Sequence, residues 1–325
     1  MMHRNPIATF VLLTVGLVLL FIMNLLWGSV PISLHETIDI LFHGGEETAL
    51  GTIHRNIILS SRLPQALTAV VAGAGLAVSG LQMQTVFHNP LAGPSVLGIT
   101  SGASLGVALV VLLASALGTV ALSSLGFLGN IALTTAAILG SMATLLLMTL
   151  IARRVENTVT LLIIGVMIGY IANAAIGVLK FFANDDDVRE YVIWGLGSFS
   201  RVSGDEVTLF VSVMAILLPL TFFMVKPMDQ LLLGDSYARN LGLNIRKARA
   251  LVILFSGTIV AIVTAYCGPF YSLVSLCLIC VVELCRRVVT VCWYQPVCSR
   301  ELCWLSSAIW SPACRATRAC SQSTL

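Results

Sequence analysis

The feature that most constrains this chain is a series of long apolar runs separated by short polar segments. A helix needs about 20 mostly apolar residues to cross a bilayer, and within lipid only helices and closed barrels satisfy their own backbone groups. Hydrophobic residues make up 58% of the chain and charged residues only 10%, which excludes a water-facing fold. We therefore predict an all-α, polytopic transmembrane helix bundle. Seven spans are expected, at residues 7–27, 64–83, 96–117, 128–151, 159–181, 207–225 and 251–266.

The orientation of the bundle follows from the basic residues of the short loops, which remain on the cytoplasmic side. With the N-terminus inside, eight lysines and arginines fall in the cytoplasm and five fall outside. Acidic residues gather instead in the two long outer loops, around Glu36 and around Asp186. We predict a cytoplasmic N-terminus, spans in contact with membrane lipid, and outer loops that meet a soluble partner.

Several classes of function are excluded by what the sequence lacks. The net charge of +3 is too small and too scattered for a nucleic-acid-binding surface. No expected span has an ionisable residue at its middle, which disfavours an ion-coupled secondary transporter, the alternative that we keep. Lys180, Lys226 and Lys247 precede Phe, Pro and Ala, so the chain has no P-loop for ATP. We expect no catalytic residue, no cofactor and no metal site, and energy supplied by a separate subunit.

A string of polar and helix-breaking residues, HNPLAGP at 88–94, separates the second and third spans. Irregular backbone near membrane depth is tolerated only when it is buried in protein or lines a water-filled cavity. A translocation pathway is one interpretation, and a plain interfacial turn is the other. His88 is expected to be a hydrogen-bonded loop residue. After this string, Gly98, Gly102 and Gly106 recur every four residues, which predicts close helix packing rather than a site.

The segment 228–249, MDQLLLGDSYARNLGLNIRKAR, is expected to face the cytosol. Asp235 is suited to cap a short helix, Gly242 to end it, and Asn244 to cap the helix that leads into the next span. Such a loop could present Leu231, Leu232, Leu233 and Leu241 to a groove of a partner, with Arg239 and Arg246 at the rim. It could also rest on the lipid surface.

A second candidate contact lies at the other side of the membrane. Arg62 precedes the second span and falls outside, against the bias of the basic residues. It could pair with a carboxylate of a partner protein, or it could reach the lipid headgroups with its charged tip.

Two strings together resemble a known family. RLPQALTAVVAGAGLAVSGLQMQTVFHNPLAGPSVLGITSGASLG and LGDSYARNLGLNIRKAR are similar to FecCD-type permease subunits of ABC importers for iron-siderophores, haem and vitamin B12. The resemblance runs over nearly all of residues 1–269. It implies ten spans, a homodimer or close heterodimer with a central pathway, cytosolic ATP-binding subunits, a periplasmic or surface binding protein, and a place in the bacterial inner membrane.

The resemblance also assigns residues. Arg62 matches an arginine that docks the binding protein. Gln82 and Gln84 at the end of the second span, with Asn89 and Pro90 of the string that follows, are the candidate pathway residues on the residue-based interpretation given above. The family's ATPase-coupling loop corresponds to Gly234, Asp235, Ala238, Arg239, Leu241 and Gly242, with Arg246 beside them.

The end of the chain does not follow this pattern. All nine cysteines lie between Cys267 and Cys320, and no apolar run of span length follows Arg287. Regrouping the codons by one base permits strings that resemble the family's continuation. We therefore predict a permease domain over residues 1–270 and an atypical, out-of-frame tail over residues 271–325, which would leave the chain without its last spans.

Overall fold

The computed structural model describes residues 6–28, 30–42, 48–89, 92–116, 127–155, 157–202 and 204–269. Every regular element within these ranges is a helix. Five helical segments are long and apolar enough to cross a membrane, and two shorter apolar helices, Thr14–Leu26 and Ile99–Leu112, fall on the first and third expected spans. The all-α bundle is thereby confirmed. The predicted tail and the boundary at residue 270 lie outside the described residues.

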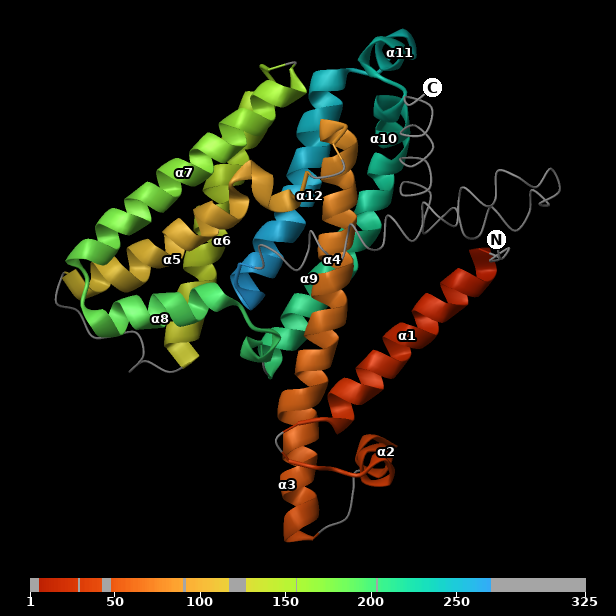
Figure 1. Ribbon diagram of the computed structural model, residues 1–325, viewed down its shortest axis with the longest axis vertical. Helices are drawn as coiled ribbons and strands as arrows, with labels where there is room; N and C mark the ends of the chain where they lie inside the picture. The colour runs from red at the N-terminus through yellow and green to blue at the C-terminus, as the bar shows by residue number, and fades with distance from the viewer. Residues whose placement is uncertain are drawn as a thin grey trace, which may run out of the picture.

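The first part of the chain builds one helix that leans away from the bundle, one short helix and one very long helix (Figure 1). Helix α1, Pro6–Leu26, diverges from the bundle, and α2, Leu34–Phe42, follows it. Helix α3, Ala49–Ile57, continues through a π-helical turn η1, Ile58–Arg62, into α4, Leu63–Phe87. Residues Leu50–Phe87 thus form one continuous rod of 38 residues. A π turn within an α-helix is rare and is commonly found at functional positions.

The middle of the chain forms a group of helices beside the long rod (Figure 1). A short 3-10 turn η2, Pro94–Leu97, leads into α5, Ile99–Ala116, which packs on α6, Phe127–Ala152. At their crossing, a Cβ on Gly102 would lie 2.8 Å from the Gly140 carbonyl oxygen, so the two backbones touch. This confirms the prediction that these glycines serve close packing. Helix α7, Thr158–Phe182, and α8, Asp185–Leu196, complete this group of helices.

The last described part places one helix at the centre of the molecule. After η4, Phe199–Arg201, come α9, Asp205–Leu220, η5, Thr221–Met224, and α10, Val225–Leu232. The short α11, Asp235–Asn240, then precedes α12, Ile245–Cys267. Helix α12 packs against α4, α5, α6 and α9, and 67% of its most apolar window is buried, more than in any other candidate span.

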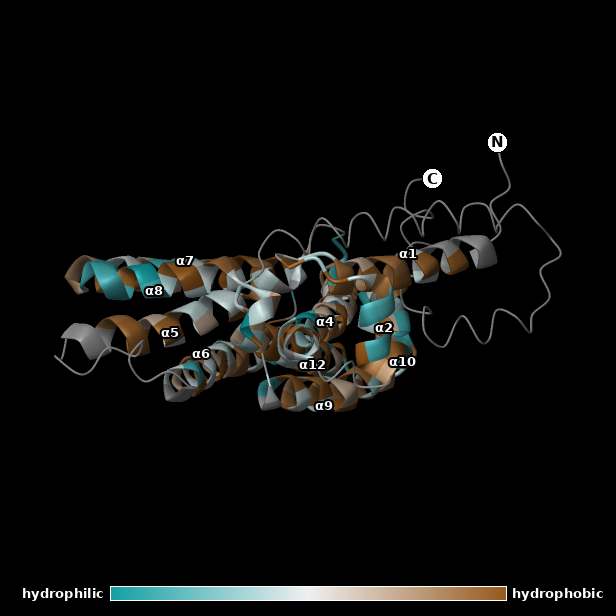
Figure 2. Ribbon diagram, turned by 90° about the horizontal axis from the view of Figure 1, so that it is seen from below, coloured by the Kyte–Doolittle hydropathy of each residue, from teal (hydrophilic) through white to brown (hydrophobic). Residues whose placement is uncertain are grey.

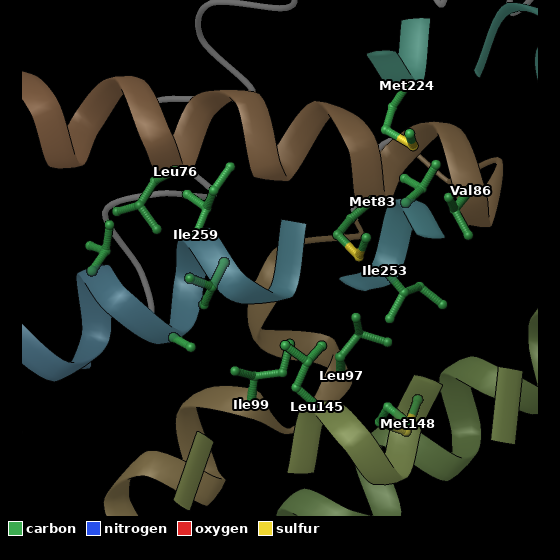
Figure 3. Close-up of a cluster of buried hydrophobic side chains, with 14 of the residues drawn as sticks. Leu76, Met83, Val86, Leu97, Ile99, Leu145, Met148, Met224, Ile253 and Ile259 are labelled. Atoms are coloured by element: carbon green, nitrogen blue, oxygen red, sulfur yellow. The ribbon is translucent and has the colours of Figure 1, made fainter. Parts of the chain in front are cut away.

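The core lies between α12, α4 and α6 (Figure 3). Met83, Leu145 and Ile253, one from each of these helices, are each at most 1% exposed. Outward faces are equally apolar: Leu139 of α6 and Ile171 of α7 are about 70% exposed, and brown ribbon covers much of the outside in Figure 2. An apolar exterior of this kind matches a helix bundle that is surrounded by lipid.

Candidate functional site

The most distinctive local structure is α11, which projects beyond the end of the bundle (Figure 1). It lies between two glycines with left-handed or otherwise positive φ, Gly234 at +94° and Gly242 at +83°. At its end the amide of Gly242 donates to the Arg239 carbonyl at 2.9 Å, and the amide of Leu243 donates to the Ala238 carbonyl at 3.0 Å. These two bonds form a Schellman motif. The predicted role of Gly242 as the helix end is confirmed.

Of the two predicted N-caps, only Asn244 is confirmed. Asn244 caps α12 as expected, because its Oδ1 accepts from the amide of Lys247 at 3.1 Å. Asp235 does not cap α11: the capping position is Gly234, and Asp235 is the first residue of the helix. Its carboxylate is directed to Arg249, whose Nη2 donates to Oδ1 at 2.8 Å and to Oδ2 at 2.9 Å. The ion pair occupies the carboxylate that a cap would need.

Two faces of α11 have opposite surroundings. Ala238 is fully buried against Leu231, Ile245 and Ala248, so it packs α11 onto the neighbouring helices. The expectation that Leu231 is offered outward was wrong, because it belongs to this inner cluster.

The outward face carries the apolar side chains Tyr237 and Leu241, which are 61% and 52% exposed, together with exposed Arg239. Arg246, in the first turn of α12, is also exposed. Sequence reasoning missed Tyr237, which one residue step, about 100° around the helix, separates from the buried Ala238.

Arg249 is the second residue that sequence reasoning missed as part of this site. It lies in the second turn of α12 and is 1% exposed. Buried arginines require partners for their charge and donors, and the Asp235 carboxylate is such a partner. Asp235 lies 14 residues before Arg249, which is more than the three or four residues that separate neighbours on one helix, so the sequence alone did not pair them.

His88 joins a third helix to the same end of the bundle. It ends α4 in the left-handed region, with φ of 49°, and its Nε2 lies 2.9 Å from the Leu231 carbonyl oxygen. The predicted hydrogen-bonded loop role of His88 is confirmed. The ends of α4, α10, α11 and α12 are therefore connected by polar contacts as well as by apolar packing.

The candidate pathway residues lie on one segment, the last turns of α4 and the residues that follow. Gln82 is 2% exposed, and its Oε1 has no hydrogen-bond partner within the described part of the chain. Gln84 is half-buried, and its carbonyl accepts from the amide of Asn89 at 3.3 Å. Pro90 lies outside the described residues. Their assignment to a pathway stays a prediction.

Arg62 lies at the other end of the molecule and points inward. It is 6% exposed, and its Nη1 donates to the carbonyls of Leu25 at 2.7 Å and Leu26 at 3.0 Å, while Nη2 donates to the carbonyl of Val30. A Cβ on Gly28 would lie 2.5 Å from Nη2, so glycine leaves the room for the guanidinium. This placement differs from the exposed guanidinium that the sequence led us to expect. Docking of a partner carboxylate stays a prediction, and it would require these bonds to open.

A charged cluster on α8, η4 and α9 was also missed. Burial raises the pKa of Glu190, the neighbouring Asp187 raises it further, and Arg201 opposes the rise. Burial lowers the pKa of the Arg201 guanidinium, and Glu190 and Glu206 counteract this. These residues lie on three successive elements, α8, η4 and α9, and meet where the chain turns between them.

Comparisons with known proteins agree on one family. The model of the FecCD transport family matches residues 16–278. The haemin transport system permease protein HmuU of Yersinia pestis is 31% identical over 79% of this chain and 74% of its own length. The vitamin B12 import permease BtuC of Serratia proteamaculans is 32% identical over 82% of this chain and 72% of its own length. A solved inward-facing structure, described as an ABC transporter of metal-chelate type, superposes with a TM-score of 0.69 at 24% identity, covering 96% of this chain and 90% of that one.

Proposed function

Because the chain belongs to the FecCD transport family, we propose that this multi-pass inner-membrane permease subunit serves an ABC importer for iron-siderophore, haem or cobalamin. ATP hydrolysis by a separate cytosolic subunit would drive the transport, since the sequence contains no P-loop. A periplasmic or surface binding protein would deliver the substrate, and a second copy of the permease would complete the pathway. The N-terminus and α11 would lie on the cytosolic side.

The observation that carries this proposal is the construction of α11. It is a separate helix that is fixed at one face by Ala238 and exposes Tyr237 and Leu241 on the other. Aromatic and apolar side chains that project from a helix face are typical anchors for a groove in a partner protein. Exposed Arg239 and Arg246 would flank these anchors and meet acidic residues at the rim of the groove.

We further propose that Gln82, Gln84, Asn89 and Pro90 contribute to the translocation pathway. The support is the buried Gln82 amide, whose Oε1 lacks a partner in the described chain and can accept a hydrogen bond from cargo or water. In the complete dimer, water or the cargo would donate a hydrogen bond to that oxygen.

The first test uses the association of the permease with its ATP-binding subunit, because the tail is expected to impair transport. Replacing Tyr237 with alanine removes a central anchor and should weaken the association about tenfold or more. Exposed Leu139 of α6, replaced with alanine, is the control for loss of apolar surface elsewhere. Unchanged binding of Tyr237→Ala to the ATP-binding subunit, measured in detergent, would contradict the proposed role of α11.

A second test addresses the shape of α11 rather than its surface. Gly242→Val places a β-branched residue at a φ of +83° and should disrupt the helix end. The Gly73→Ala variant is the control, since an added Cβ there meets nothing within 4 Å. Association with the ATP-binding subunit is expected to fall for Gly242→Val alone, and an equal loss in both variants would argue against a specific role for the Schellman end.

The predicted frame change is tested on the gene. We propose that residues 271–325 are an out-of-frame translation, and the family match ends at residue 278, soon after that boundary. Resequencing should reveal codons that spell a family-like continuation one base away. An intact frame through Gly268 without such codons would refute the proposal and leave the tail as native sequence.

A further inference from the structure

The two chain connections of α11 are not enough to fix its position. It has only six residues, and each of its ends is a glycine with positive φ, where the backbone has unusual freedom. A short helix between two such joints can pivot when it is pushed. A partner that presses on α11 would displace it locally unless α11 is fastened to a larger body.

Besides the packing of Ala238 against Ile245 and Ala248 of α12, the Asp235–Arg249 ion pair fastens α11 to the bundle. The Arg249 side chain is 2% exposed, while the Asp235 side chain is 45% exposed, so the pair runs from the interior of the bundle to its surface. Both carboxylate oxygens accept from the same guanidinium nitrogen, at 2.8 and 2.9 Å. A charge-assisted contact of this kind is stronger than a neutral hydrogen bond. It links the first residue of α11 to the second turn of α12.

Helix α12 is the body to which α11 is fastened. It packs against α4, α5, α6 and α9, and at its centre the Ser79 hydroxyl donates to the Ser256 carbonyl at 3.1 Å, which ties it to α4. A Cβ on Gly257 would collide with Leu145 of α6, so the helices are in close contact there. Tightly packed interiors move as units rather than deform continuously.

We propose that Arg249 is a positioning residue that, through Asp235, makes α11 and α12 move together, so that a push on α11 reaches the centre of the bundle. This inference rests on the proposed function, because the partner that pushes is the ATP-binding subunit. Arg249 itself is too buried to touch that partner.

The first measurement is hydrogen exchange in the purified full chain, without any partner. Asp235→Asn and Arg249→Gln each break the ion pair and should speed hydrogen exchange of the α11 amides about fivefold, with the centre of α12 unchanged. The double variant should exchange no faster than the more affected single one, since both remove the same contact. Lys247→Gln, an exposed residue of the first turn of α12, is the matched control and should leave α11 unchanged.

The second measurement tests whether the ion pair passes movement of α11 on to α12 or only holds α11 in place. With the ATP-binding subunit and ATP added at saturation, exchange at residues 250–256 of α12 should change in the unaltered chain. Arg249→Gln, which leaves every residue of the coupling loop unaltered, should still bind the subunit but lose this response, and Arg249→Lys, which retains the charge, should keep part of it.

The outcomes distinguish the two proposals. Exchange in α11 that stays unchanged in both single variants, or effects that add in the double variant, would overturn the role of Arg249. A full response at residues 250–256 in Arg249→Gln would overturn it as well. Failure of the unaltered chain to bind any ATP-binding subunit would instead refute the proposed function, while the exchange of α11 in the isolated chain would still decide whether the ion pair fastens it.

Discussion

Two buried arginines hold opposite ends of the molecule by different means. Arg249 neutralises a carboxylate 14 residues away. Arg62 donates to three backbone carbonyls that lie 32 to 37 residues before it. A carboxylate carries a full opposite charge and can rotate toward its partner. Three carbonyls carry only partial charges, and their positions depend on the way in which α1 ends. The first contact is therefore expected to tolerate change in shape, and the second is expected to tolerate little.

The consequences for stability should be unequal. Arg62→Met removes the donor from the carbonyls of Leu25, Leu26 and Val30 at once, and we expect the free energy of unfolding to fall by about 3 kcal/mol. Arg249→Met leaves Asp235 half-exposed, so that its carboxylate is rehydrated, and about 1 to 2 kcal/mol should be lost. Chemical denaturation in detergent measures both. Equal losses in the two variants would show that the kind of acceptor does not matter.

Gly28 offers a way to disturb Arg62 without altering it. Gly28→Ala places a Cβ 2.5 Å from Nη2 and 2.9 Å from Cζ, so the guanidinium must move. Overpacking of this kind costs about 1 to 3 kcal/mol. Gly16→Ala, within the preceding helix α1, meets nothing within 4 Å and is the control. A cost for Gly28→Ala no greater than that for Gly16→Ala would mean that the Arg62 contact contributes little.

Lysine substitutions probe the smallest expected difference. Lysine keeps the charge but not the planar fork of donors. Arg249→Lys should retain most of the stability, with a loss of about 1 kcal/mol or less, because one ammonium can still reach the Asp235 carboxylate. Arg62→Lys should lose clearly more, because an ammonium cannot reproduce the directions of both guanidinium nitrogens. The two variants can be compared by the midpoint of denaturant unfolding, and the reverse order would break the comparison.

The same contrast explains what could be predicted from the sequence. The seven apolar segments, the end of α11 at Gly242 and the cap at Asn244 follow from local patterns, and the structure agrees with them. The inward turn of Arg62 was not predictable, because its acceptors belong to a different helix. Asp235 looked like a cap since nothing local revealed Arg249 as its partner.

Helix faces were the other limit. In a water-soluble protein the apolar face of a helix is its buried face, but in a membrane the lipid-facing side is apolar as well. Leu161 and Ile171 of α7 are similar in hydropathy, yet the first is fully buried and the second is 70% exposed. The periodicity of an apolar chain therefore predicts a span without indicating which side meets protein. For the same reason, hydropathy alone did not predict that Leu231 is buried and Tyr237 is exposed.

The π turn at Ile58–Arg62 separates the alignment of α3 from that of α4. An α-helix turns by about 100° for each residue, so one residue more or less in a continuous rod rotates everything beyond it by that angle. Deleting Ser60 would remove the residue by which this turn exceeds an α-helical one. Helix α3 would then rotate about the axis of the rod, and His54 would leave Glu36, with which its Nδ1 is in contact. The packing of α4 in the core would stay as it is. An insertion or deletion in this turn would therefore change the direction in which α3 faces, while the packing of α4 in the bundle stays the same.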